Sequence, residues 1–427
     1  VIEHCDEGNT LSGDRCSATD TTETNYVCPT TGMPCVSTVV DGVVLARQGQ
    51  AMMNLLDIDH IDVLKSPQGT LFGMNSSGGV IKIVTKQPSF QPSGHIDFGY
   101  FDADEFRSQA SFTGPIASDR VAARASFMVD SYPGNVLNVY NGDNERINGY
   151  QDYGARTQFL IRGAGSARFL ITTDYTHTYE TTPQGVFAQI YNPAFASVIA
   201  PAAAGPDSRE VNSNYNTYDL DTNYGYALTA DWNIGELRAT SITAFRDWTN
   251  VQYQDIGRAP GLFIGFPQED DLGKLWFQQV SEEFRVATQG TRRLDYVAGL
   301  FLFEGRDHEN YQRATTAYSG GATANYLGFA DYGTVNRNGA VFGDATLHLT
   351  RHLSAIAGAR LIHEELGFNF GRVANVQKTV PGIQPAFAAT GSTDDTNYMG
   401  RLGLQANLPV GGIAYLTWSR GYKGPAY

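Results

Sequence analysis

Residues 64–89 read LKSPQGTLFGMNSSGGVIKIVTKQPS: two glycine-bearing turns, an alternating apolar run and a Lys-Gln-Pro ending. Glycines in such a pattern either cradle a phosphate at the start of a helix or turn the chain between strands. A Walker loop needs Gly-Lys-Ser/Thr after its turn, and a dinucleotide loop needs Gly-x-Gly-x-x-Gly. The glycines here fit neither spacing, and the run that follows Gly79 is typical of a strand. The stretch is therefore predicted to turn the chain between strands.

The composition favours a large β protein. The chain has 44 Asp and Glu against 30 Lys and Arg, a net charge of −14 that argues against a nucleic-acid partner. Charged residues make up 17% of the 427 positions, and Tyr, Phe and Gly are abundant. No run approaches 18 apolar residues, which excludes a transmembrane helix. Barrel strands escape such a test because their apolar residues alternate with polar ones.

From residue 95 onward apolar and polar residues alternate. In residues 121–130 the odd positions are apolar, whereas the even positions include Arg124, Ser126 and Asp130. This period of two predicts strands with one apolar and one polar face. The expected strands cover 95–102, 106–115, 120–130, 153–162, 167–178, 224–234, 237–248, 276–288, 294–304, 339–349, 353–366, 398–408 and 412–420.

The lengths of the connections separate a barrel from a soluble sandwich. Short connections alternate with long ones, and the long ones cover 131–152, 179–223, 249–275, 305–338 and 367–397. Short turns on one side and long loops on the other are typical of outer-membrane barrels. Ten residues at about 45° tilt cover roughly 25 Å, the height of the apolar band. We therefore expect a mostly β protein with a transmembrane antiparallel barrel over residues 94–427.

Residues 1–93 differ from the rest and are expected to form a small α/β domain, with Pro88 and Pro92 marking its boundary. All four cysteines of the chain lie in its first 35 residues, in a segment rich in Thr, Asn, Asp and Gly. Disulfides in an oxidising compartment are favoured over a zinc site, because the close Cys-x-x-Cys pairs of zinc sites are absent. Pairing in sequence order is the simplest of three connectivities for Cys5, Cys16, Cys28 and Cys35.

The segment Ile58–Lys86 closely resembles the end of the plug domain of TonB-dependent outer-membrane receptors. Their usual form is Ile-Glu-x-Ile-Glu-Val-Leu-Arg-Gly-Pro-Gln-Gly-Thr-Leu-Tyr-Gly, then Asn-x-x-Gly-Gly-x-Ile-Asn-Ile-Val-Thr-Lys, and Val40–Val43 matches their upstream Val-Asp-Gly-Val. The chain departs from this form at Lys65-Ser66, where the family has Arg-Gly. Three further segments resemble barrel strands of the family: 280–285, 340–345 and 418–423.

The resemblance implies a receptor in the Gram-negative outer membrane that takes up a scarce ligand when the TonB protein pulls on the plug. The implied ligand is a ferric siderophore; carbohydrate, cobalamin or haem receptors and a passive porin are the alternatives. The expected partners are TonB, outer-membrane lipid and that small molecule, with no nucleic acid. About 13 of the family's roughly 22 strands are present. We therefore expect a chain truncated at both ends, with the TonB contact box outside it.

In this family the plug loop after Val-Asp-Gly-Val rises toward the outside and touches the ligand. Here that loop offers Arg47, Gln48 and Gln50, a forked cation and two amides suited to an anionic chelate. The alternative is that Arg47 pairs with a carboxylate of the barrel wall and only holds the plug. Tyr215 and Tyr218, in a long connection, are expected to add contact area from above.

No catalytic constellation emerges from the sequence. His363-Glu364-Glu365 begins like a zinc-protease motif but has no second histidine, and Asp57-x-Asp59-x-x-Asp62 lacks the glycine and distal glutamate of a calcium loop. No Gly-x-Ser-x-Gly elbow occurs. We therefore expect neither an enzyme nor a cofactor or metal site.

Overall fold

The computed structural model describes most of residues 36–427. The residues that it does not describe are 1–35, 52–55, 74–75, 118, 143, 182–184, 258, 264–266, 291, 320–321, 381, 409–410, 423 and 426–427. The four cysteines and their expected disulfides lie outside the described residues. In the part that is described, none of the helices has the length and apolar character needed to span a membrane.

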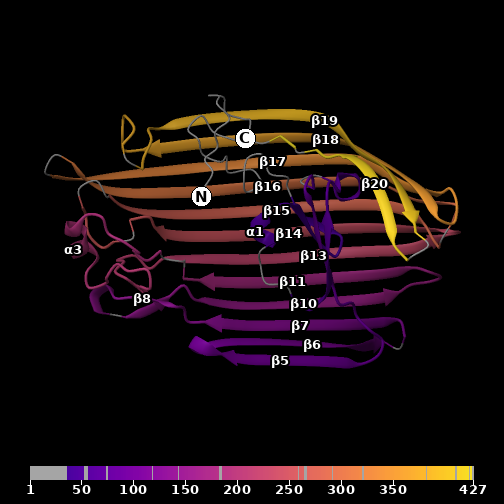
Figure 1. Ribbon diagram of the computed structural model, residues 1–427, viewed down its shortest axis with the longest axis horizontal. Helices are drawn as coiled ribbons and strands as arrows, with labels where there is room; N and C mark the ends of the chain where they lie inside the picture. The colour runs from indigo at the N-terminus through magenta and orange to yellow at the C-terminus, as the bar shows by residue number, and fades with distance from the viewer. Residues whose placement is uncertain are drawn as a thin grey trace.

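One curved antiparallel sheet dominates the molecule (Figure 1). Its thirteen described strands follow chain order, and each expected strand has its counterpart. The strands are β5 (Ser93–Phe101), β6 (Glu105–Ala117), β7 (Val121–Tyr132), β10 (Tyr150–Arg162), β11 (Arg168–Glu180), β13 (Tyr218–Ile234), β14 (Leu237–Asp255), β15 (Gln268–Thr288), β16 (Leu294–Ser319), β17 (Ala322–His348), β18 (Leu353–Ala374), β19 (Phe387–Asn407) and β20 (Ile413–Arg420).

Several strands are much longer than the ten or so residues expected. β16 has 26 residues and β17 has 27, so the long connection predicted over 305–338 is wrong: almost all of it is a paired hairpin. The prediction stopped each strand at the height of the apolar band. Beyond that height the ladder continues, because each backbone group still finds its partner on the neighbouring strand.

The two faces of the sheet divide by polarity. In β7, Phe127 and Val129 are exposed on the convex side, whereas Arg124, Ser126 and Asp130 are buried on the concave side. This is the alternation expected of a barrel wall that turns its apolar face to lipid and its polar face to an interior. The predicted division of each strand into an apolar and a polar face is confirmed, and the polar face looks inward.

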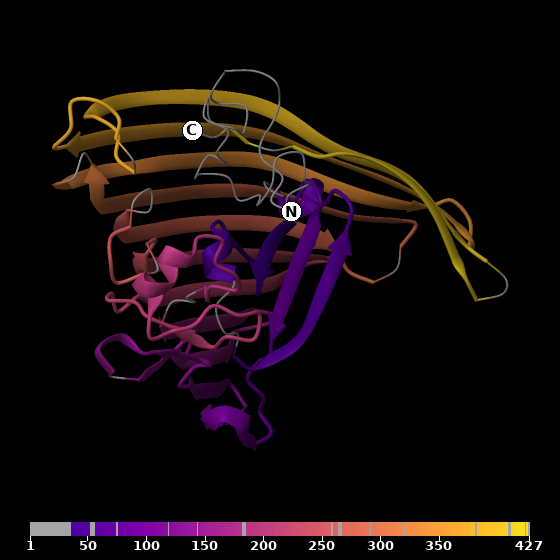
Figure 2. The ribbon, with the colours of Figure 1, turned by 60° about the vertical axis from the view of Figure 1, so that its left-hand side comes forward.

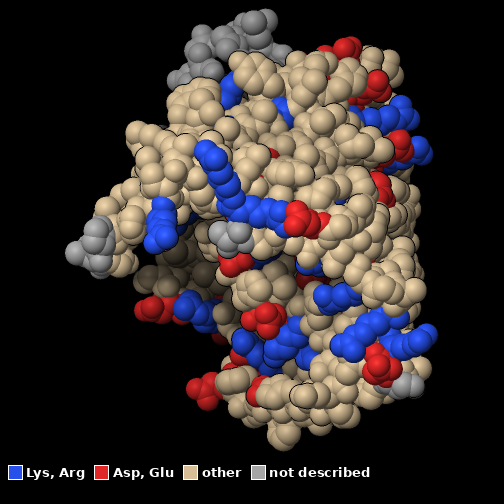
Figure 3. All heavy atoms as spheres, turned by 90° about the vertical axis from the view of Figure 1, so that its right-hand side faces the viewer, with Lys and Arg blue, Asp and Glu red and all other residues tan. Residues whose placement is uncertain are grey.

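The connections at one end of the sheet carry extra structure. That end holds η1 (Asp102–Asp104), η2 (Tyr140–Gly142), η3 (Pro193–Phe195) and α3 (Ala196–Ile199), together with a small sheet in the order β12-β8-β9. The strands of the small sheet are β8 (Val136–Asn138), β9 (Glu145–Ile147) and β12 (Glu210–Val211). The opposite end has short turns, and Figure 3 shows basic and acidic side chains mixed on that face. The predicted asymmetry of the two ends is confirmed. The strands also take up much of the predicted connections 249–275 and 367–397, because β14, β15, β18 and β19 extend beyond the lengths expected.

A second, four-stranded sheet forms the plug and lies inside the curve of the large sheet (Figure 2). Its order is β2-β1-β4-β3, with β1 and β4 parallel and the other pairs antiparallel. Val40, Leu45 and Ile83 form its buried core. The elements of the plug are β1 (Val36–Val40), β2 (Val43–Leu45), α1 (Gln48–Ala51), β3 (Ile58–Lys65), α2 (Gly69–Phe72) and β4 (Gly79–Thr85).

Residues 64–89 connect two paired strands, as predicted. β3 ends at Lys65, the single turn α2 follows, and β4 returns antiparallel to β3. Ser66, which stands where the family has glycine, adopts a φ of 71°. That left-handed conformation costs an L-residue roughly 1–2 kcal/mol, which explains why glycine suits this position.

Candidate functional site

The plug is fastened to the wall by a buried ion pair. Arg124 of β7 donates through Nε and Nη2 to the carboxylate of Asp57, and the Nη2–Oδ1 distance is 2.7 Å. Ser126 donates to the same carboxylate at 2.6 Å, and the Lys86 ammonium lies 3.9 Å away. Burial by itself raises the pKa of Asp57, but the hydrogen bonds and positive charges around it hold that pKa below its ordinary value. The carboxylate is therefore ionised at neutral pH.

Further hydrogen bonds tie the plug backbone to inward-facing side chains of the wall. Arg156 donates to the carbonyl oxygen of Leu56 at 2.7 Å. The Gln279 amide donates to the carbonyl oxygen of Val44 at 2.8 Å and accepts from the Ala46 amide at 3.1 Å. These contacts come from widely separated strands, so the plug is held on several sides.

Arg47 lies between β2 and α1 and reaches the wall. Its Nη2 lies 2.5 Å from Oδ2 of Asp307 on β16, and its guanidinium lies 5.6 Å from the ring centre of Phe277. The Asp307 side chain is 3% exposed and that of Arg47 is 22% exposed. Arg47 thus makes the wall contact that was the alternative to a ligand role, and its guanidinium stays partly accessible.

Of the two glutamines in the same loop, the structure describes the side chain of Gln50. Gln50 is 2% exposed, and both polar atoms of its side chain lack a hydrogen-bond partner in the described part of the chain. The side chain of Gln48 lies outside the described residues. Between them, Gly49 lies against the wall so closely that a Cβ there would be 2.5 Å from the Trp248 ring. The loop therefore presses onto β14.

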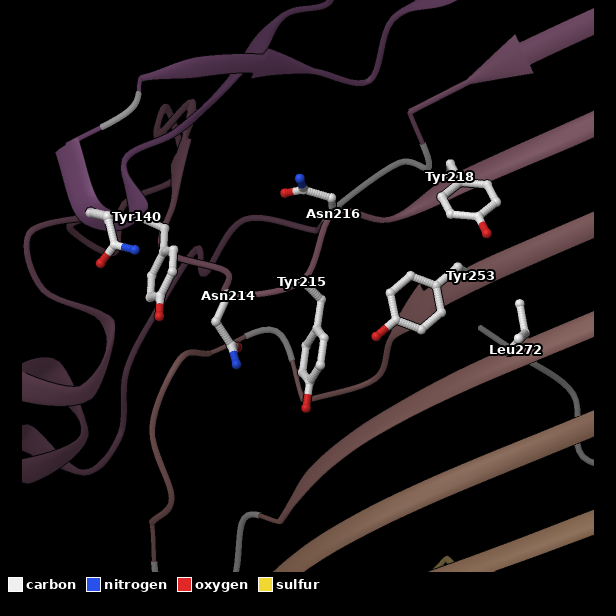
Figure 4. Close-up of a pocket in the computed structure, with 8 residues that line it drawn as sticks. Tyr140, Asn214, Tyr215, Asn216, Tyr218, Tyr253 and Leu272 are labelled. Carbon is white, nitrogen blue, oxygen red and sulfur yellow. The ribbon is translucent and has the colours of Figure 1, made fainter.

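A pocket of about 530 Å³ opens at the loop-bearing end of the sheet (Figure 4). Its side chains are phenols and amides with one leucine, and none carries a formal charge. They come from η2, from the segment before β13, and from the outer parts of β13, β14 and β15. The lining residues are Tyr140, Asn141, Asn214, Tyr215, Asn216, Tyr218, Tyr253 and Leu272.

Tyr253 is the centre of the aromatic part of the pocket. The Tyr215 ring meets it edge-on, with 6.0 Å between centroids and an interplanar angle of 81°, and the Tyr218 ring lies 5.9 Å away. The Tyr253 hydroxyl donates to the Asp270 carboxylate at 3.4 Å. Burial and the Asp270 charge raise the pKa of Tyr215, so its phenol stays protonated and able to donate.

The structure brings together only some of the residues singled out in the sequence. Tyr215 and Tyr218 line the pocket, whereas Arg47 and Gln50 lie at the plug–wall boundary and are not among its lining residues. Sequence reasoning missed Tyr253 because residues 249–275 were treated as a loop; continuing the alternation of β14 would have included it. Tyr140 carries no local signal, since only the folding of η2 over the strands places it there. Among the described residues no cluster of His, Cys, Asp and Glu is suited to a metal ion.

Comparison with known proteins gives a consistent picture. Residues 30–80 match the TonB-dependent Receptor Plug Domain family. The pesticin receptor of Yersinia enterocolitica is 25% identical over 403 residues, 92% of this chain and 53% of its own length. The chain thus spans about half the length of the curated relatives it matches.

Two solved structures share the fold. The ferric yersiniabactin uptake receptor of Yersinia pestis superimposes with a TM-score of 0.73 at 20% identity, covering 91% of this chain and 56% of the other. The open form of the ferric-catecholate import receptor of Escherichia coli K12 gives 0.67 at 13% identity, covering 91% and 63%. With a plug-domain match, a plug sheet inside a curved barrel wall and relatives of this kind over nine-tenths of its length, the chain belongs to the TonB-dependent receptors of the Gram-negative outer membrane.

Proposed function

We propose that this receptor binds a ferric siderophore in the tyrosine pocket and imports it across the outer membrane with energy supplied through TonB. The observation that carries the proposal is the uncharged pocket of phenols and amides at the loop-bearing end, above a plug that is fastened to the wall. The relatives named for ferric yersiniabactin, ferric catecholate and ferripyoverdine support the ligand class.

The pocket suits a chelate of moderate size. Small-molecule sites commonly measure about 300–1,000 Å³, and this one falls within that range. A siderophore encloses iron within its own donor atoms and leaves rings and amides for the protein to contact. Tyrosine rings stack on such groups, and asparagine amides donate and accept hydrogen bonds without adding charge.

The plug–wall contacts favour energised transport over a passive pore. Asp57 and Arg124 form a pair that is about nine-tenths buried, and breaking such a pair costs about 3–5 kcal/mol. Thermal motion therefore moves the plug aside only rarely. A pull through TonB would supply the work, and the ligand would pass where the plug had been.

Fluorescence titration of the purified receptor with ferric yersiniabactin and a ferric catecholate tests the ligand class. Tyr218→Ala is expected to weaken binding about tenfold, since the contact between aromatic rings contributes on the order of 1 kcal/mol beyond the area it buries. Tyr191→Ala is the matched control, because Tyr191 lies in the connection that leads to β13, is 89% exposed and does not line the pocket. Binding of haem, cobalamin or an oligosaccharide instead of both chelates would overturn the siderophore assignment.

Uptake by cells tests the mechanism separately. Cells that express the receptor but lack TonB should bind the radioactive ferric chelate at the surface and accumulate none. Undiminished accumulation in those cells would favour the passive porin.

A further inference from the structure

A second, smaller cavity lies between the plug and the wall. Its volume is about 180 Å³, and it shares no residue with the tyrosine pocket. The plug contributes residues of β1, β2 and α2, and the wall contributes residues of β15 to β18 near their short-turn ends. The lining residues are Val39, Gly42, Val44, Leu71, Phe72, Glu283, Arg285, Val297, Phe301, Phe342 and Arg360.

Arg360 is the unusual member of this lining. It is 2% exposed, and its guanidinium lies 5.1 Å from the ring centre of Phe301 and 5.2 Å from that of Phe342. Across the described part of the chain it makes no ion pair, and its buried Nε has no hydrogen-bond partner. Aromatic rings attract the positive charge but accept N–H groups only weakly. The Nε–H of Arg360 therefore lacks an oxygen acceptor among the described residues.

The charges around the cavity leave one cation incompletely compensated. Among the described lining residues Glu283 is the single carboxylate; Arg285 donates to it at 2.8 Å, and the Glu283 charge also acts on Arg360 without a hydrogen bond. Two guanidiniums thus share one carboxylate, and Arg360 is the one that makes no salt bridge among the described residues, in a place where burying an incompletely compensated charge is costly. The plug closes over it: a Cβ on Gly73 would lie 2.9 Å from Nη2 of Arg360.

We propose that this cavity is a binding site for a small monovalent carboxylate, with Arg360 as its cation and the plug as its lid. A carboxylate would give the guanidinium oxygen acceptors in the fork geometry that arginine prefers. A water molecule needs only about 10–15 Å³ of such volume, so the cavity has room for an acetate-sized anion with water beside it. Because plug and wall both line the site, a bound anion stabilises the seated plug. The site is independent of the siderophore proposal, since its probe and its residues are different.

Acetate is the probe, and the purified receptor is titrated by calorimetry and by thermal unfolding at constant ionic strength set with chloride. Acetate should raise the unfolding midpoint in a saturable way, whereas acetamide, its neutral analogue, should not. Arg360→Gln should weaken acetate binding at least tenfold. Arg246→Gln is the matched control, because Arg246 is also a buried arginine of the wall but is paired with Asp174 at 2.8 Å; this variant should keep the acetate response.

The proposal is overturned when acetate stabilises the wild-type receptor no more than acetamide does, or when Arg360→Gln binds acetate as well as the wild type. The first comparison needs no variant, so it decides the matter even where Arg360→Gln does not fold. Arg360→Lys gives a further check: it keeps the charge and loses the fork, so its acetate affinity should lie between those of the wild type and Arg360→Gln.

Discussion

Asp57→Asn should loosen the plug from the wall while leaving the barrel sheet intact. The Asp57 and Arg124 side chains are 8% and 10% exposed, and removing one partner of such a buried pair costs about 3–5 kcal/mol. Asparagine retains one oxygen acceptor for Arg124, which places the expected cost at the lower end, about 3 kcal/mol. The backbone tolerates the change, because Asp57 has a φ of 56° and asparagine adopts left-handed conformations readily.

Hydrogen–deuterium exchange of the β4 amides measures this cost as the free energy of plug opening. A loss of about 3 kcal/mol should speed their exchange on the order of a hundredfold, with the amides of β16 and β17 unchanged. Asp62→Asn is the matched control within the plug: Asp62 pairs with Lys82 at 3.0 Å, but both side chains are well exposed, so its loss should cost less than about 1 kcal/mol. If β4 exchanges no faster in Asp57→Asn than in Asp62→Asn, the buried pair does not hold the plug.

Three further outcomes follow from single residues of the plug. The depressed pKa of Asp57 contributes stability above the ordinary carboxyl value of 3.8, and this stability is lost as the pH falls through the lower folded-state pKa. Acidification should therefore lower the protection factors of the β4 amides, measured relative to intrinsic exchange at each pH, in the wild type and much less in Asp57→Asn. Arg47→Ala should lower the thermal stability by about 1–3 kcal/mol through loss of the Asp307 pair; weakened siderophore affinity with unchanged stability would instead assign Arg47 to the ligand. Ser66→Gly should stabilise the plug by about 1 kcal/mol in urea unfolding, and a destabilised variant would contradict the strain inferred from its φ.

The strands of the wall could be predicted because their signal is local. Alternation such as that of 121–130 is set by two neighbouring environments, lipid and lumen, and each strand carries it independently. The outer ends of β16 and β17 could not be placed in the same way. Beyond the apolar band both faces carry polar residues, and only pairing with the neighbouring strand keeps the backbone extended.

The residues that line the tyrosine pocket could be predicted only in part. The reason is not the same as for the outer strand ends. Tyr215 and Tyr218 stand in one aromatic-rich segment, so a single stretch of sequence points to them. Tyr140 lies 75 residues before Tyr215 in the chain, and nothing in its neighbourhood indicates a pocket. Arg47 illustrates the remaining difficulty: the residue type predicted either a ligand or a carboxylate partner, and only the tertiary fold supplies Asp307.

The polarity of the plug–wall boundary bears on how a folded domain can be moved within a barrel. A plug held by a dry apolar core would expose that core whenever it shifted, at about 25 cal/mol per Å². Part of the boundary here is apolar, since Val43 packs against Ile242 of β14. The wall also turns Arg124, Arg156 and Gln279 toward the plug, and their hydrogen bonds can be exchanged for bonds to water as the plug leaves. Each bond is costly to break in a closed interface and cheap to replace once water enters. A pull that first opens the interface at one edge would therefore release the remaining contacts in sequence, which fits the energised transport proposed above.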